Sequence, residues 1–211
     1  MDGHVAKKQC TTSSIELNLG ACTSMSLYKG SYNCTSEEFS EFESFMLKTS
    51  CTPNKWRPST NILRKQCCFF LPDAPIESYD FGQKQDSYVM EKKCMPTLLS
   101  RIFSTMDDVY NMAQCNYYEN GGVGITKHKD DEKCIDSNYP IISVTFYRKT
   151  TDIRPFSIYN LHDDKVLDII IAHGDKLIMR NQTEFQHGIE KDRPKKYGPR
   201  INFTFRVAKE M

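Results

Sequence analysis

The chain has 211 residues, with 28 Lys and Arg against 27 Asp and Glu and a formal charge of +1. This length is that of one large domain, and the balanced charge excludes a general attraction to polyanions, so nucleic-acid binding would need local basic clusters. No stretch approaches the roughly 20 apolar residues of a membrane span, so no membrane contact is expected.

Nine cysteines are scattered along the chain, and no Cys-x-x-Cys motif occurs among them. A structural zinc site is therefore not predicted. The first residues lack the apolar core of a signal peptide. We therefore expect free thiols in a reducing compartment and an intracellular protein, cytoplasmic or nuclear.

The N-terminal part of the chain differs in composition from the rest. Residues 1–33 are rich in Ser, Thr, Cys and Lys without periodicity, which predicts a flexible polar arm. A folded domain is expected from residue 34 to residue 211. It begins with a capping box, Thr35 followed by Glu38, which predicts a helix with an apolar face that starts at Phe39.

The middle of the chain mixes strand, loop and helix patterns. Residues 64–71 have the composition of a strand that ends before two prolines. Tyr79 and Phe81 then combine aromatic and polar character, which fits either an ordinary turn or a lid whose rings stack on a base. From Pro96 to about Tyr110, apolar residues at helical spacing predict a second helix.

Strand patterns dominate the second half of the chain. The expected strands cover residues 112–118, 141–147, 168–172, 176–179 and 200–207. Because helices come first and strands follow, the pattern favours an α+β fold in which helices pack on one face of a mainly antiparallel sheet.

A candidate metal site lies after the glycine-rich turn at residues 120–124. His128 and Asp130 are two residues apart, so their side chains point the same way if this segment is extended. One imidazole and one carboxylate are two of the three ligands of a facial Fe(II) site. Of the remaining histidines, His187 follows an apolar run and precedes a glycine, and we choose it as the third ligand.

The last predicted strand alternates between apolar and polar residues. Arg200, Asn202 and Arg206 share its polar face. This pattern is typical of a solvent-exposed antiparallel strand, but two guanidinium groups and an amide on one face also suit an anionic occupant, because guanidinium grips a carboxylate through two hydrogen bonds.

Together these motifs resemble the AlkB-like Fe(II)/2-oxoglutarate-dependent dioxygenases. The resemblance extends from about residue 36 to residue 207. It rests on Asn116-x-Tyr118, His128-x-Asp130-Asp131-Glu132, His173-Gly174-Asp175, His187-Gly188-Ile189 and Arg200-x-Asn202-x-Thr204-Phe205-Arg206. The terminal Arg-x-Asn-x-Thr-Phe-Arg motif is the most specific of these.

The resemblance implies a double-stranded β-helix, or jelly roll, with N-terminal helices packed on one face. Its catalytic core would span residues 112–207, and a nucleotide-recognition lid would span about residues 55–92. The cofactors implied are Fe(II), 2-oxoglutarate as co-substrate and O2.

The same resemblance assigns roles to individual residues. The Fe(II) ligands, which are also the catalytic residues, would be His128, Asp130 and His187. The 2-oxoglutarate site would comprise Asn116, Tyr118, Arg200, Asn202 and Arg206, with Arg200 on the distal carboxylate and Arg206 also supporting Asp131. The substrate would meet Asp131, Glu132, Tyr79 and Phe81.

The activity implied is oxidative demethylation of 1-methyladenine and 3-methylcytosine in RNA or single-stranded DNA by a monomer, with release of succinate and formaldehyde. These bases are cationic, and Asp131 is a suitable carboxylate partner for them. One alternative is an N6-methyladenine RNA demethylase of viral type. Another, from a different class, is an inactive dioxygenase fold that serves as a nucleic-acid-binding module.

Overall fold

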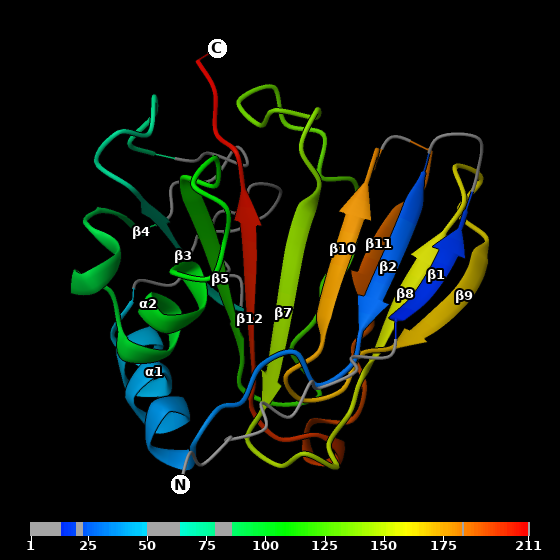
Figure 1. Ribbon diagram of the computed structural model, residues 1–211. Coiled ribbons are helices and arrows are strands. Elements are labelled where there is room, and N and C mark those ends of the chain that lie inside the picture. Colours follow the sequence, from blue (N-terminus) through cyan, green and yellow to red (C-terminus); the bar gives the residue numbers. More distant parts are fainter. Residues whose placement is uncertain (1–13, 20–22, 50–63, 79–85, 183, 211) are drawn as a thin grey trace, which may run out of the picture.

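Two β-sheets and two α-helices make up the fold in the computed structural model, which describes residues 14–19, 23–49, 64–78, 86–182 and 184–210 (Figure 1). In spatial order, the eight-stranded sheet contains β1 (Ser14–Asn18), β2 (Ser24–Tyr28), β10 (Lys176–Arg180), β7 (Ile141–Tyr147), β12 (Arg200–Arg206), β5 (Met112–Tyr118), β3 (Lys65–Phe70) and β4 (Asp86–Val89). The four-stranded sheet contains β6 (Ile125–His128), β11 (Gln186–Ile189), β8 (Pro155–Tyr159) and β9 (Lys165–Ile170).

The two sheets form a jelly roll that is antiparallel except where β3 pairs with β4. One apolar cluster joins them, with Leu177 and Met179 from the large sheet and Ile158 and Ile189 from the small one. Because sheets that pack face to face bury one face each, this cluster fixes the inner side of the sandwich. The α+β jelly roll expected from the sequence is confirmed.

The helices cover the outer face of the large sheet on the β3–β5 side (Figure 1). Helix α1 (Ser36–Lys48) begins with the predicted capping box, in which Thr35 and Glu38 exchange hydrogen bonds. Helix α2 (Thr97–Phe103) is shorter than predicted. The hydroxyls of Ser104 and Thr105 donate to carbonyls of the last turn, and such local bonds compete with helix continuation.

Part of the expected N-terminal arm belongs to the large sheet. Strand β2 pairs with both β1 and β10, and Met25 and Leu27 are buried in the core between the sheets. The expectation of a flexible arm is therefore wrong for residues 14–18 and 24–28. The low apolar content of this segment gave no strand pattern. Strand β2 forms because it pairs with β10, which lies about 150 residues away in sequence.

Strand β12 connects the core to the functional face. Ile201, Phe203 and Phe205 point into the helix-side core, so Arg200 and Asn202 point to the other face, between the sheets. The strand lies between β5 and β7 with an unbroken register on both sides. Its polar face is buried and not solvent-exposed, because the small sheet covers it.

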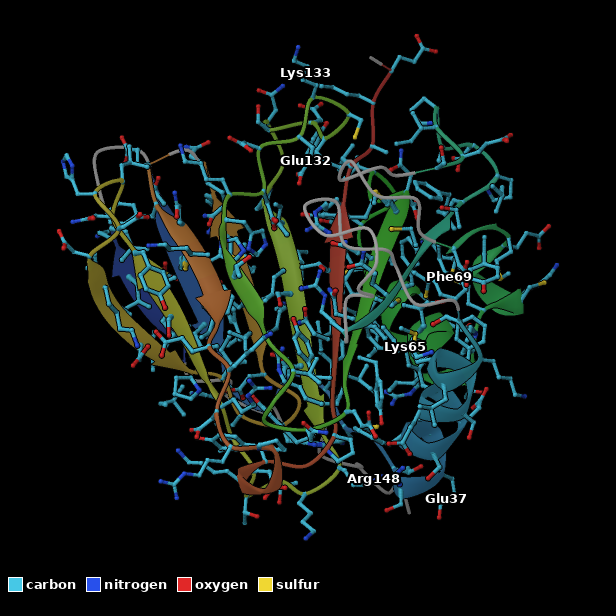
Figure 2. The ribbon with its side chains drawn as sticks, turned by 180° about the vertical axis from the view of Figure 1, so that it is seen from behind. Glu37, Lys65, Phe69, Glu132, Lys133 and Arg148 are labelled. Carbon is cyan, nitrogen blue, oxygen red and sulfur yellow. The ribbon has the colours of Figure 1, made fainter. Side chains whose placement is uncertain are left out.

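The two ends of the sandwich carry different loops. Glu132 and Lys133 lie in the loop at one end, and Arg148 and Glu37 lie at the other (Figure 2). The 3₁₀ helices η1 (Lys92–Cys94) and η2 (Pro194–Lys196) are short connectors. Within the described residues, no helix has the length and apolar character needed to cross a bilayer.

Candidate active site

His128, Asp130 and His187 come together between the sheets. One ligand atom from each lies within 4.8 Å of the other two. His128 ends β6, and it is the direct register partner of His187 in β11. Asp130 follows two residues later and is buried, with 8% of its surface exposed. Cross-strand pairing therefore brings the third candidate ligand, 59 positions further along the chain, beside the first.

The donor atoms are available for a cation. The Nδ1 atom of His128 donates to the Thr126 carbonyl at 2.9 Å, which leaves the Nε2 lone pair facing Asp130 Oδ1 at 3.5 Å. The Nε2 atom of His187 lies 3.8 Å from Asp130 Oδ2. Asp130 Oδ1 is buried without a hydrogen-bond partner among the described residues. Two imidazoles and one carboxylate fit an Fe(II) ion with open coordination positions.

The surroundings keep these ligands in their metal-binding protonation states. Burial alone raises the pKa of Asp130, but the Arg206 guanidinium and the two imidazoles outweigh burial and hold the pKa well below its ordinary value. Burial, followed by the neighbouring His128, lowers the pKa of His187 to about 3. The Phe156 ring stacks on His187 with ring centroids 5.1 Å apart. Proton competition at Asp130 and His187 is therefore weak near neutral pH.

Arg200 has the surroundings of an anion-binding side chain. It is 2% exposed, and its direct neighbours on β5 and β7 are Tyr118 and Tyr147. Their rings lie 4.9 Å and 6.0 Å from its guanidinium carbon. Its Nη2 atom donates to Thr145, but Nε and Nη1 have no hydrogen-bond partner among the described residues. A buried guanidinium with two open donors fits a carboxylate such as the distal one of 2-oxoglutarate.

A cavity of about 840 Å³ contains both features. Its lining includes all eight residues that the family resemblance assigned to the metal and to 2-oxoglutarate, namely Asn116, Tyr118, His128, Asp130, His187, Arg200, Asn202 and Arg206. The buried Oδ1 atom of Asn116 also lacks a hydrogen-bond partner within the described residues. The Asn202 amide nitrogen instead donates to Ser143, Val144 and Thr145 on β7, so Asn202 braces the sheet.

Arg206 has a different contact from the one expected. Its Nη2 atom donates to Asp130 Oδ2 at 2.9 Å, and both side chains are 2% exposed. The contact described for Arg206 is thus with Asp130, which turns inward, and not the one expected with Asp131, which is exposed. Arg206 links the last strand of the large sheet to the carboxylate of the metal site, and such bonds orient metal ligands.

The expected substrate contacts are less well placed. Neither Asp131 nor Glu132 lines the cavity, and Glu132 is only partly buried. Tyr79 and Phe81 lie outside the described residues. The described part of the expected lid, residues 64–78 and 86–92, includes two strands of the large sheet: β3 is buried in the core and β4 is the edge strand beside it. Which residues of these segments face the cavity depends on the strands they pair with, and the sequence pattern did not show that pairing.

Sequence analysis gave no role to several other cavity residues, and three of these have long, buried polar side chains. Arg64, Gln66 and Gln114 line the cavity and are buried, and Arg64 donates to Gln66 at 2.6 Å. Arg64 and Gln66 are two residues apart at the start of β3, so strand alternation could have indicated a shared polar face. Adjacent cysteines and phenylalanines in the same strand obscured this signal, because β3 is buried on both faces.

Comparison with known proteins places the chain in a family. The sequence profile of the 2OG-Fe(II) oxygenase superfamily matches residues 34–206. Alpha-ketoglutarate-dependent dioxygenase alkB homolog 3 of Mus musculus is 31% identical over 119 residues, 53% of this chain and 41% of that protein. DNA oxidative demethylase ALKBH2 of Bos taurus is 30% identical over 112 residues, 50% of this chain and 40% of that protein.

A solved structure agrees on the fold. The structure of OsALKBH1 matches with a TM-score of 0.52 at 16% identity, and the match covers 86% of this chain and 96% of that one. The chain spans about two-fifths of the length of the curated relatives it matches. The profile match covers most of the chain, and the cavity has ligands that suit both the metal and the co-substrate of the family. The chain therefore belongs to the 2OG-Fe(II) oxygenase superfamily, whose cofactors are Fe(II), 2-oxoglutarate and O2.

Proposed function

We propose that this chain catalyses oxidative demethylation of N-methylated bases in nucleic acid, with 1-methyladenine and 3-methylcytosine as substrates in RNA or single-stranded DNA. The observation that carries the proposal is the shared cavity, in which a His-Asp-His cluster faces a buried guanidinium with two open donors. The similarity to a protein named DNA oxidative demethylase supports nucleic acid as the substrate class.

Each group in the cavity has a role in this proposal. His128, Asp130 and His187 hold Fe(II), and Arg200 binds the distal carboxylate of 2-oxoglutarate. With Fe(II) bound there, O2 would be the oxidant and 2-oxoglutarate would be decarboxylated to succinate and CO2, and this chemistry would hydroxylate an N-methyl group that then leaves as formaldehyde. Arg206 orients Asp130, and Phe156 shields the His187 ring from water.

The proposed preference for cationic bases depends on charge near the cavity. Asp131 directly follows a metal ligand and is exposed, so its carboxylate is available to a base that enters from solvent. A cationic methylated base loses hydration on entry, and a nearby carboxylate offsets part of that cost. N6-methyladenine is neutral and gains nothing from this charge.

Phosphate contacts would come from two basic clusters. The first, Lys127, Lys129 and Lys133, surrounds the metal ligands in sequence. The second comprises Lys191, Arg193, Lys195 and Lys196. Lys127 pairs with Asp163 at 2.8 Å and Lys196 with Asp192 at 2.6 Å, so ion pairs partly neutralise both clusters. Binding should still weaken with salt, because phosphate contacts release counterions.

The test is turnover on a panel of methylated oligonucleotides. Single-stranded RNA and DNA with 1-methyladenine, 3-methylcytosine or N6-methyladenine are incubated with Fe(II) and 2-oxoglutarate, and formaldehyde and succinate are quantified. Equal amounts of both products on the cationic bases support the proposal. Succinate release without demethylation of any base would contradict nucleic-acid demethylation, and Asp130→Ala provides the baseline.

A further inference from the structure

Arg154 lies outside the metal and 2-oxoglutarate sites but is one of the largest fully buried side chains, with 2% of its surface exposed. It immediately precedes β8. Burying a guanidinium is costly unless its donors are satisfied. The hydrogen bonds of the Arg154 guanidinium therefore indicate its structural role.

The Arg154 guanidinium donates to the backbone at two separate places. Its Nη1 atom bonds the Val123 carbonyl at 2.7 Å, in the turn before β6. Its Nη2 atom bonds the Glu190 carbonyl at 2.6 Å, just after β11. Longer contacts of 3.4 Å reach the carbonyls of Asn120 and Gly121. One side chain thus links the start of β6 to the end of β11.

The backbones at this link pack closely. A Cβ atom at Gly121 would collide with the Arg193 carbonyl oxygen, and one at Gly124 would collide with the Ile189 carbonyl oxygen. The Gly121 carbonyl also accepts a hydrogen bond from the Asp192 amide at 2.8 Å. We call this contact of residues 120–124 with residues 189–193, held by Arg154, the glycine junction.

The glycine junction lies where β6 begins and β11 ends. The two strands are antiparallel: β6 runs from the junction to His128, and β11 carries His187 and runs back to the junction. Their own ladder is weak, because only two residue pairs are in register and a shift lies between them. A slip by one residue would turn a ligand to the opposite face.

We infer that Arg154 is a positioning residue for the metal site, because it fixes the register of β6 against β11 from the end opposite the ligands. This inference rests on the proposed Fe(II) site and adds a residue that touches neither metal nor substrate. Partners that orient metal ligands typically change metal affinity by about 10- to 100-fold when they are removed.

The test measures Co(II) affinity of the full chain by absorption titration, without 2-oxoglutarate or nucleic acid. Arg154→Met keeps the apolar stem and removes the donors, and the dissociation constant for Co(II) should rise by about 10- to 100-fold. The matched control is Arg148→Met. Arg148 pairs with Glu43 on α1, so this variant should lower the unfolding midpoint and leave Co(II) affinity unchanged.

Chemical rescue separates positioning from general destabilisation. In Arg154→Ala the side chain is replaced by a cavity, and free guanidinium ion at non-denaturing concentration should restore Co(II) affinity there but not in Arg154→Met. If neither Arg154 variant folds, Gly124→Ala provides the second approach, because it pushes the junction apart and should weaken Co(II) binding.

Failure of the role proposed for Arg154 and failure of the metal site give different results. Unchanged Co(II) affinity in a folded Arg154→Met protein, or in Gly124→Ala when that variant is needed, would overturn the role of Arg154. Absent rescue of a weakened Arg154→Ala protein would also overturn it. Failure of the wild-type chain to bind Co(II) would overturn the metal site itself, and with it the proposed function.

Discussion

The two halves of the cavity are carried by strands of different length and pairing. The half around Arg200 rests on β5, β7 and β12, each seven residues long and joined by unbroken registers. The metal half rests on β6 and β11, each four residues long, and Asp130 follows the end of a strand. A long central ladder holds its side chains in place by itself, whereas the metal half needs braces such as the bond from Arg206 to Asp130.

This difference predicts how each half responds to substitution. Changes at Arg200 should weaken 2-oxoglutarate binding and leave the fold intact, because the sheet does not depend on the open donors of Arg200. Changes at the metal end should affect metal binding and stability together, because the ligands also hold the short strands in place.

The largest effect is expected from Asp130→Ala. The substitution removes a proposed metal ligand, which is also the carboxylate to which Arg206 donates, so Co(II) binding and turnover should be lost. Stability should fall by about 3 kcal/mol, the lower end of the cost of breaking a buried ion pair. Metal titration and urea unfolding measure the two effects, with Asp130→Asn as the control that keeps shape. Retained metal binding would contradict the assignment of Asp130.

Arg200→Lys should show a large but separate effect. Lysine keeps the charge and loses the fork that holds a carboxylate at two points. A hydrogen bond to a charged group contributes about 1.5–3 kcal/mol, so the KM for 2-oxoglutarate should rise roughly 10- to 100-fold. Co(II) affinity in the absence of 2-oxoglutarate should stay at the wild-type value. An unchanged KM would show that the co-substrate binds elsewhere.

The metal-free protein should lose stability below pH 6.5 because of His187. Its pKa is lowered from 6.5 to about 3, so the unfolded chain takes up a proton first as the pH falls. Stability from this group is complete above pH 6.5 and decreases until about pH 3. Between pH 6.5 and pH 5.5 the loss should be about 1 kcal/mol.

Urea unfolding in EDTA at these two pH values measures that loss. In the His187→Gln protein, the loss of unfolding free energy between the two pH values should be smaller than in the wild type by about 1 kcal/mol. In Arg200→Lys, the loss should equal that of the wild type. Equal pH effects in wild-type and His187→Gln would mean that His187 does not titrate as its burial requires.

The smallest effect is expected from Asp131→Asn. The side chain is exposed and does not line the cavity, so its charge acts through solvent. Exposed charge pairs contribute about 0.2–1 kcal/mol, which corresponds to at most roughly fivefold. Demethylation of 1-methyladenine and 3-methylcytosine should fall by this factor while activity on N6-methyladenine and succinate release stay constant. An equal loss on all three bases would indicate a structural role.

Much of the architecture could be predicted from the chain alone. The capping box at Thr35 placed α1 correctly, and alternation along residues 112–118, 141–147 and 200–206 placed β5, β7 and β12. These elements are determined locally, because a cap or an alternating pattern requires only a few neighbouring residues. The missed strands include β1, β2, β4, β8 and β11, which are short or weakly apolar and depend on pairing with other strands.

The sequence by itself determined which residue types were available for the chemistry, and the resemblance of their motifs assigned the ligand set. Only the tertiary structure decided how they meet. The pairing of β6 with β11 placed His187 beside His128, and the packing of the small sheet over β12 made an ordinary polar strand face the buried lining of the cavity. It also directed Arg206 to Asp130 and Arg154 to the glycine junction. The physical reason is that strand register and burial are properties of partners, which no local pattern contains.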